Sequence, residues 1–167
     1  MSSQDSRSSS QLIASALAVV VRAEKVLLVR RRNRPDRGMW GFPGGKLNDG
    51  ESAHTAATRE LFEETGVTAR AGITLSTLHL KYHPNDPDLT VHYAMTPVLF
   101  EWIEGEPIAN DDALEAGWHV VQDVLEGRLA QSQNVDATLR SAIAFAINGN
   151  SKKPHQVGSV LPRIISM

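Results

Sequence analysis

Hydrophobic and polar residues alternate with the period of β-strands in several separate parts of the chain. The clearest case is a pair of runs rich in β-branched residues, 14–22 and 25–31, separated only by Ala23-Glu24. Two extended runs joined by two residues predict a β-hairpin. Further strands are predicted over residues 73–82, 91–102 and 118–121. Pro97 predicts that the second of these lies at a sheet edge or is broken, because proline has no N–H to donate.

Two segments have the composition or the apolar spacing of helices. The first, 53–65, is rich in helix formers, begins after Ser52 and ends before Gly66, which can close a helix in the left-handed conformation. The second, 136–148, places its apolar residues at helical spacing. Strands mixed with two separated helices predict an α/β fold in which a sheet lies between helices.

Three further segments have unusual composition. Residues 30–37 hold five arginines and a proline. Residues 40–45 hold three glycines and a proline, which predicts an irregular loop instead of a helix or a central strand. Residues 105–117 are polar and acidic, and are predicted to form a loop that leads into the short strand near Trp118.

Composition narrows the class of protein. The chain of 167 residues is 41% hydrophobic and 22% charged, as globular domains are. One domain is predicted over 11–150, with a disordered serine-rich tail over 1–10 and a C-terminal tail over 151–167. A net charge of −2 gives no general attraction to nucleic acid or to anionic membranes, and the apolar run 12–21 is too short to cross a bilayer. The absence of cysteine fits a reducing compartment, so a cytoplasmic location is expected.

The helix predicted over 53–65 has an unusual face. Its small and apolar residues, Ala53, Ala56, Ala57 and Leu61, fall within one arc of a helical wheel. Three carboxylates, Glu60, Glu63 and Glu64, fall within the same arc. Two carboxylates 4 Å apart repel each other by about 4 kcal/mol at an effective dielectric constant near 20. Either the neighbouring Arg59 or a hard divalent cation can offset this repulsion, unless the three residues are simply a solvated acidic run.

The spacing of this segment resembles the Nudix box, the signature of hydrolases that act on nucleoside diphosphates linked to another moiety. The matching positions are Gly45, Glu51, Arg59-Glu60-Leu61, Glu63-Glu64 and Gly66-Val67. Nine fixed positions in a frame of 23 residues make this pattern specific. The resemblance implies an α/β/α sandwich with a central mixed β-sheet, in which the box forms a loop, a helix and a loop that bind Mg²⁺ or Mn²⁺.

The resemblance also implies roles for individual residues of the box. Glu60 and Glu64 are expected to bind the metal, with Glu63 as a further ligand and catalytic residue. A backbone carbonyl of Gly44 or Gly45 would complete the set, and Gly44 would also lie against the substrate. Arg59 is expected to orient the glutamates through charged hydrogen bonds, for which Glu51 could be an acceptor.

Two groups of residues outside the box are candidates for the same site. Members of this family often take a general base from a loop before the last strand, and here Asp112 is the first candidate, followed by Glu115 and Asp111. Among the arginines, Arg30, Arg32 and Arg37 are candidates for binding substrate phosphates. The alternative for both groups is that they are solvated loop residues.

Substrate identity is left open by the box. ADP-ribose or a related nucleotide sugar is the first expectation, because Pro84 and the residues from Asp112 to Trp118 resemble the ADP-ribose pyrophosphatase branch. The alternatives are a nucleoside triphosphate, oxidised or not, and a dinucleoside polyphosphate, the latter because of Tyr82. A nucleotide-binding module without catalysis is less favoured, because every carboxylate of the box is present. The expected partner is thus a small nucleotide and not a nucleic acid or membrane, with a homodimer left open.

Overall fold

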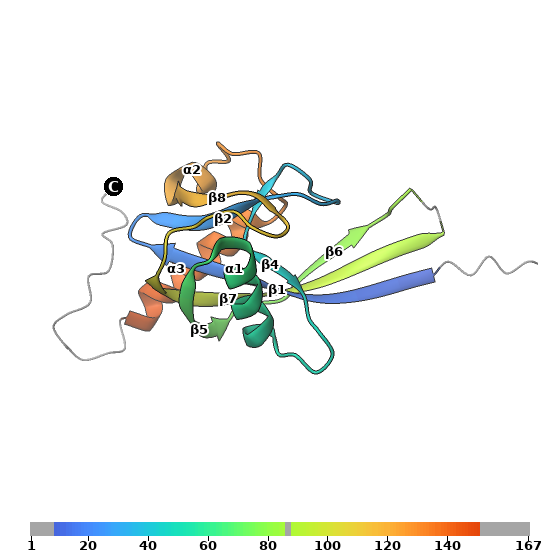
Figure 1. Ribbon diagram of the computed structural model, residues 1–167, viewed down its shortest axis with the longest axis horizontal. Coiled ribbons are helices and arrows are strands. Elements are labelled where there is room, and N and C mark those ends of the chain that lie inside the picture. The colour runs from blue at the N-terminus through green and yellow to red at the C-terminus, as the bar shows by residue number, and fades with distance from the viewer. Residues whose placement is uncertain (1–8, 86–87, 151–167) are drawn as a thin grey trace, which may run out of the picture.

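The computed structural model describes residues 9–85 and 88–150, in which a mixed β-sheet has helices on both faces (Figure 1). The strands are β1 (Ser9–Arg22), β2 (Lys25–Arg31), β3 (Trp40–Gly41), β4 (Gly44–Lys46), β5 (Thr68–Thr74), β6 (Leu78–Tyr82), β7 (Leu89–Glu104) and β8 (Ala113–Val120). The helices are α1 (Ala53–Thr65), α2 (Val121–Leu125) and α3 (Val135–Asn150). None of these described helices is long and apolar enough to cross a bilayer.

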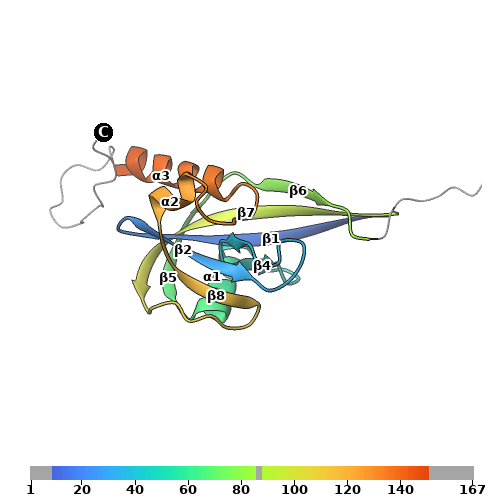
Figure 2. The same cartoon turned by 90° about the horizontal axis from the view of Figure 1, so that it is seen from above.

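The predicted sandwich of a sheet between helices is confirmed. Figure 2 shows α1 on one face of the sheet, and α2 with α3 on the other. Side chains of β1 alternate between the two layers, so that Ala18 and Val20 pack in the core beneath α1 whereas Val19 packs in the core beneath α2 and α3. All three are 0% exposed. Both faces of β1 are therefore buried, which explains why its sequence is a nearly continuous apolar run.

The sheet is mixed because β1 and β7 run parallel, while every other pair of named strands is antiparallel. The predicted hairpin of β1 and β2 is confirmed, with Arg22 opposite Lys25 across the turn. Beyond the hairpin the two strands separate: β2 pairs with β8 along its whole length, and β4 pairs with β1 at Ser15–Leu17. This separation brings the end of β2, β4 and the start of β8 to one side of the sheet, beside α1.

The strand predicted over 73–82 is instead two strands, because β5 ends at Thr74 and β6 begins at Leu78. The gap between them lies opposite Pro97, which continues β7 without a break. The prediction that Pro97 marks an edge or a break of its own strand is therefore wrong. Proline has no N–H to donate, and on the side where this donor would point the neighbouring strand is interrupted between β5 and β6, so no hydrogen bond of the sheet is lost. The Pro97 carbonyl accepts a hydrogen bond from the Leu75 N–H at 2.8 Å.

The prediction of an irregular loop over residues 40–45 is also partly wrong. Short strands β3 and β4 lie on either side of Phe42 and Pro43. A Cβ on Gly44 would lie only 2.2 Å from the carbonyl oxygen of Ala16 in β1. Glycine therefore permits a strand here instead of preventing one, because it lets the two backbones approach closely.

Several element boundaries differ from the prediction. β8 begins at Ala113, so the last residues of the predicted acidic loop, 113–117, form part of a strand. Their extended conformation comes from pairing with β2, which their own sequence does not indicate. The short helix α2 was not predicted. β1 begins at Ser9, so the last two residues of the predicted N-terminal tail belong to a strand. The rest of that tail, 1–8, and the predicted C-terminal tail, 151–167, lie outside the described residues.

Helix α1 has the predicted limits, because both ends are fixed by local interactions. The Ser52 side chain accepts a hydrogen bond from the Thr55 N–H at 3.1 Å. Gly66 closes the helix with φ of 69°, and its N–H donates to the Phe62 carbonyl. Ala56, Ala57 and Leu61 are buried against the sheet. This packing fixes the rotation of α1 and with it the direction of its acidic side chains.

Candidate active site

Glu64 lies in the last turn of α1, and its carboxylate is buried: only 6% of the residue is exposed. One of its oxygens accepts a hydrogen bond from the Gly44 N–H at 3.2 Å. Burial raises its pKa to about 8, with a smaller contribution from the nearby Glu60, while the Gly44 N–H and Arg31 act in the opposite direction. The metal-free protein therefore holds Glu64 largely protonated at neutral pH, and a cation that bound there would displace the proton.

Glu60 lies one helical turn before Glu64 and faces β4. A Cβ on Gly45 would lie 2.3 Å from the Glu60 Oε1 atom, so only a glycine leaves room for this carboxylate. Burial raises the pKa of Glu60, and the hydrogen bond from Arg59 partly opposes this effect. Two carboxylates on adjacent turns thus face a strand that has no side chain at the point of contact.

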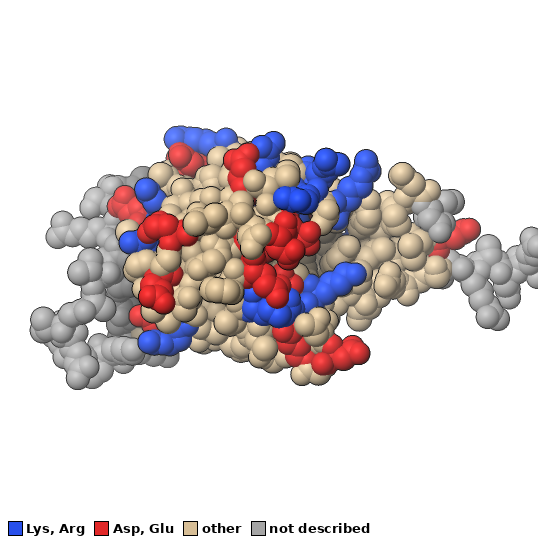
Figure 3. Space-filling model, in the orientation of Figure 1, with Lys and Arg blue, Asp and Glu red and all other residues tan. Residues whose placement is uncertain are grey.

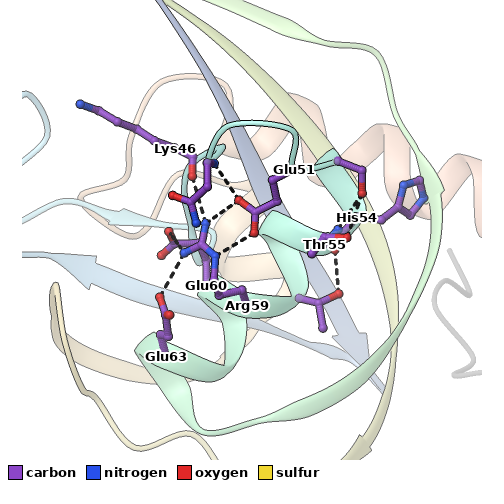
Figure 4. Close-up of polar contacts among 10 residues, drawn as sticks. Lys46, Glu51, His54, Thr55, Arg59, Glu60 and Glu63 are labelled. Carbon is purple, nitrogen blue, oxygen red and sulfur yellow. Dashed lines mark hydrogen bonds and ion pairs between the residues drawn. The ribbon is translucent and has the colours of Figure 1, made fainter.

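Arg59 neutralises much of the acidic charge around it (Figure 4). Its guanidinium forms a two-pronged contact with Glu51, with both N–O distances 2.9 Å, and donates to Glu60 at 2.7 Å. It also donates to Glu63 at 3.2 Å and to the Lys46 carbonyl at 3.1 Å. The Arg59 contact lowers the pKa of Glu51 to about 2, so Glu51 stays ionised. The planar fork of Arg59 thus links α1 to the loop before it, and its predicted role in orienting metal ligands stays a prediction.

Replacing Arg59 by lysine should lower kcat/KM by about tenfold to a hundredfold, as loss of a partner that orients a metal ligand does. Lysine keeps the charge but cannot form the fork that holds Glu51 and Glu60 together. Steady-state kinetics with the substrate that the nucleotide panel described below identifies, at a saturating concentration of divalent cation, would measure the effect. Arg70→Lys is the matched control, because the Arg70–Glu101 pair is 70% and 74% exposed. Wild-type kinetics for Arg59→Lys would refute the orienting role.

Glu63 is placed differently from the other two glutamates. Its side chain is 45% exposed, and its only described contact is the one with Arg59. Among residues 9–85 and 88–150, no three acidic or histidine side chains are arranged as a ready-made metal site. Glu60 and Glu64 are therefore the two box glutamates that line one cavity, and the predicted metal-binding roles of all three glutamates stay predictions.

Glu60 and Glu64 line a cavity that also contains cationic side chains. The basic residues that line it are Arg31, Arg32, Arg34 and Lys46. Asp112, Gly44 and Gly45, three of the predicted site residues, line the same cavity. Figure 3 shows acidic side chains gathered at the centre of this face, with basic side chains above and below them. Cations beside carboxylates in one cavity suit a ligand that carries phosphate groups and a metal ion.

Five predicted site residues do not line this cavity: Arg59 and Glu63 of the box, and Arg30, Arg37 and Glu115 outside it. Arg30 donates to the Gly38 carbonyl at 3.0 Å and pairs with Glu115 at 2.7 Å. This pair is a cross-strand contact, because Arg30 of β2 lies opposite Glu115 of β8. Arg37 lies on the same loop as Arg32 but does not line the cavity. The partial exposure of the Arg30 and Glu115 side chains, 42% and 54%, fits a surface ion pair.

Asp112 is held at the start of β8 by two neighbouring residues of the loop after β2. The Arg32 N–H donates to the Asp112 carbonyl at 3.0 Å, and the Asn33 side-chain amide donates to Asp112 Oδ1 at 2.9 Å. Asp111, the third candidate for a general base, adopts a left-handed conformation with φ of 52° and does not line the cavity.

Sequence reasoning did not single out several residues of this cavity. Arg31, Asn33, Lys46, Tyr93 and Ser15 all line it. Lys46 follows the glycine pair directly, and Arg31 belongs to the arginine-rich segment, so position in the sequence could have suggested both. Tyr93 and Ser15 face the cavity only because β7 pairs with β1, and no local signal indicates that pairing.

An apolar compartment adjoins the cavity. The two share Leu17, Arg31, Pro35, Tyr93 and Met95. The compartment continues to Phe42 and to the first turn of α3, where the hydroxyls of Ser132 and Thr138 are buried without a described hydrogen-bond partner.

Glu60, Glu64 and the backbone at Gly44-Gly45 fit a hard divalent cation such as Mg²⁺ or Mn²⁺. The donor atoms are all oxygen, which such ions prefer. Glu64 is buried and has no ion-pair partner among the described residues, and the cavity that it shares with Glu60 provides room for an ion.

Comparison with known proteins agrees with these features. A family model described as NUDIX domain matches residues 12–138. The chain is 34% identical over 98 residues to an ADP-ribose pyrophosphatase of Methanocaldococcus jannaschii, a match that covers 59% of this chain and 56% of the relative. It is 30% identical over 134 residues to an ADP-ribose pyrophosphatase of Bacillus subtilis, covering 79% of this chain and 70% of the relative.

A solved structure of another protein has a similar fold. The crystal structure of the MutT NUDIX hydrolase from Burkholderia pseudomallei superposes with a TM-score of 0.62 and 25% identity, covering 78% of this chain and 97% of that one. The chain spans from 32% to 60% of the length of the first curated relatives it matches. With a family model over residues 12–138, an α/β/α sandwich around a mixed sheet, and box glutamates brought together on α1, the chain belongs to the NUDIX family.

Proposed function

We propose that the protein is a divalent-metal-dependent pyrophosphohydrolase of a nucleoside diphosphate linked to another moiety, with ADP-ribose or a related nucleotide sugar as the first candidate. One observation carries the proposal: the buried carboxylate of Glu64 and that of Glu60 share a cavity with Arg31, Arg32 and Lys46. A buried carboxylate without a described ion-pair partner, beside a second carboxylate and a group of cations, suits a metal ion together with a phosphate chain. The names of the two ADP-ribose pyrophosphatases support the choice of substrate.

The cavity and its neighbouring compartment divide such a substrate into two parts. The diphosphate would lie over Glu60 and Glu64, within reach of the basic residues. The nucleobase would enter the apolar compartment, where Phe42 and Tyr93 offer flat faces. This arrangement requires the two spaces to be continuous, and their shared lining residues support that requirement.

The proposed reaction is the attack of water on one phosphorus of the diphosphate. When bound, a divalent cation would neutralise phosphate oxygens and lower the pKa of a water molecule. A new bond forms between the water oxygen and phosphorus, and the bond from phosphorus to the bridging oxygen breaks, so that the bridging oxygen leaves with its electron pair on the second phosphate. Asp112 takes the proton of the attacking water, while Arg31 and Arg32 balance the charge of the phosphate oxygens.

A nucleoside triphosphate is the second candidate substrate. It also has one base and a phosphate chain, and thus makes the same use of the apolar compartment and of the cavity. A Bacillus subtilis relative named putative 8-oxo-dGTP diphosphatase, 45% identical over 51 residues, keeps this candidate beside the first. A dinucleoside polyphosphate would need a place for a second base in addition.

Incubation with a panel of nucleotides, followed by identification of products, tests the proposal. The panel contains ADP-ribose, dinucleoside polyphosphates, NADH, and canonical and oxidised nucleoside triphosphates, each with Mg²⁺ and with a chelator. Cleavage of ADP-ribose to AMP and ribose phosphate, lost with the chelator, is the expected result. Cleavage of triphosphates alone would replace the first candidate by the second. Binding of nucleotides without cleavage would instead support a non-catalytic binding module.

Replacing Asp112 by asparagine should lower kcat by about a hundredfold, within the range that general-base catalysis contributes. Asparagine has the same shape but cannot accept the proton. Metal affinity should change little, because Glu60 and Glu64 are untouched, and titration with Mn²⁺ would check this. The control is Asp123→Asn, since Asp123 pairs with Arg128 on the surface in α2. An unaltered rate would show that Asp112 is not the general base.

A further inference from the structure

The loop after β2 holds Asp112 through both its backbone and its side chain. The Arg32 N–H donates to the Asp112 carbonyl at 3.0 Å, and the Asn33 side-chain amide donates to Asp112 Oδ1 at 2.9 Å. The pairing of Arg31 with Ala113 brings these residues together, because it places the end of β2 beside the start of β8. Asn33 and Asp112 therefore meet across two segments that are far apart in the sequence.

The segment before Asp112 is fixed from the opposite direction, by α1. The Asn110 N–H donates to the Glu64 carbonyl and the Ile108 N–H donates to the Thr65 carbonyl, both at 3.0 Å. These carbonyls belong to the last turn of the helix and have no partner within it. The loop is thus attached to the same helix end that carries the candidate metal ligands.

Between these two attachments Asp111 has a left-handed backbone with φ of 52°. Aspartate adopts this conformation more readily than most residues other than glycine, and the hydrogen bonds around it decide whether it is kept. The hydrogen bonds of Asn110 on one side and of Asp112 on the other keep it here. The path of the chain therefore presents Asp112, and not Asp111, to the cavity.

We infer that Asn33 is a positioning residue for Asp112. The side-chain amide of Asn33 occupies one carboxylate oxygen, which fixes the rotamer of Asp112 and leaves the second oxygen to accept a proton. Both residues line the cavity that contains Glu60 and Glu64. The inference rests on the proposed function, because Asn33 affects catalysis only if Asp112 is the general base.

A double-mutant cycle tests the inference. Asn33→Ala should lower kcat about tenfold, since a slightly misplaced catalytic group is costly, and should change KM less than twofold. Asn33→Asp, which has the same shape but no N–H donor, should lower kcat at least as much. In the Asp112→Asn background, Asn33→Ala should cause no further loss, because residues that act through one group are not additive. Equal losses in both backgrounds, or a rise in KM alone, would instead indicate that Asn33 contacts the substrate directly and would overturn the inference.

Two further measurements separate this result from other causes. The variants should keep the wild-type melting temperature, as should the surface control Asn148→Ala in α3. The signals of the Asn33 side-chain amide protons, observed by NMR, should shift when Asp112 is replaced by alanine, and unchanged signals would refute the contact itself.

Failure of the inference can be distinguished from failure of the proposed function. If the wild-type enzyme is active and Asn33→Ala has the same activity, only the inference is overturned. A wild-type protein that cleaves nothing in the panel overturns the proposed function, and the purpose assigned to Asn33 with it.

Discussion

Replacing Glu64 by glutamine should lower turnover by about a hundredfold or more, because loss of a direct metal ligand should cost at least as much as loss of a group that only orients one. The amide has nearly the same shape and can still accept the hydrogen bond from the Gly44 N–H. It cannot supply the negative charge that a divalent cation requires. Steady-state kinetics with the substrate identified in the panel, together with titration of Mn²⁺ binding, would measure both effects. Near-normal turnover would remove Glu64 from the site.

The same substitution should change how the stability of the metal-free protein depends on pH. Glu64 has a pKa of about 8 in the folded protein against an ordinary value of 4.5. A raised pKa means that the folded state holds the proton more tightly, so stability is full below pH 4.5 and falls as pH rises towards 8. The full loss corresponds to about 5 kcal/mol, an upper value for this one group. Glutamine does not ionise and removes this loss.

Urea unfolding in a chelator would check this expectation. The stability of Glu64→Gln relative to the wild type should increase steadily between pH 5 and pH 8.5. Added Mg²⁺ should reduce or reverse the difference, because a cation that binds the ionised Glu64 stabilises the wild type by mass action. A difference that does not vary with pH would show that Glu64 is not buried as a neutral group.

Alanine at the two adjacent glycines of β4 should produce two different defects. In Gly44→Ala the new Cβ would lie 2.2 Å from the Ala16 carbonyl oxygen, a backbone atom that cannot move without shifting β1. Overpacking of this kind costs about 3 kcal/mol or more of unfolding free energy.

In Gly45→Ala the new Cβ would lie 2.3 Å from Glu60 Oε1, the end of a flexible side chain. That variant should stay folded but displace Glu60, and lose at least about tenfold in metal affinity and turnover.

Thermal unfolding and Mn²⁺ titration of both variants distinguish the two defects. Gly117→Ala is the control, because a Cβ there would meet only the His119 ring, at 3.9 Å, and stability should change by less than about 0.5 kcal/mol. Loss of metal binding in Gly44→Ala without loss of stability would contradict the packing described for β4. Unchanged metal binding in Gly45→Ala would mean that Glu60 has another position in solution.

Helix α1 was predictable because its signals are local. Ser52 and Gly66 fix its ends within one turn of the chain, and the alanines decide which face meets the sheet. The same geometry explains why the wheel placed Glu64 correctly. Glu63 shares the predicted arc but lies at its edge, where its side chain is partly exposed and pairs with Arg59.

The loops and edges were predicted less well, because distant segments determine them. β8 has weak strand preference of its own, and its order comes from pairing with β2. That pairing turned Glu115 into a surface partner of Arg30 and placed Asp112 at the cavity instead. Pro97 and the glycines of β4 were misinterpreted for a related reason: their effect depends on which backbone lies opposite.

The sequence by itself determined the layered fold, the family, and the pair of carboxylates on α1, since each follows from residues within a few turns of one another. Only the tertiary structure decided which cations share the cavity with those carboxylates, and that Asn33 holds Asp112. The reason is physical. Periodicity specifies which face of an element is buried, whereas the meeting of two loops depends on strand pairing between residues that are far apart along the chain.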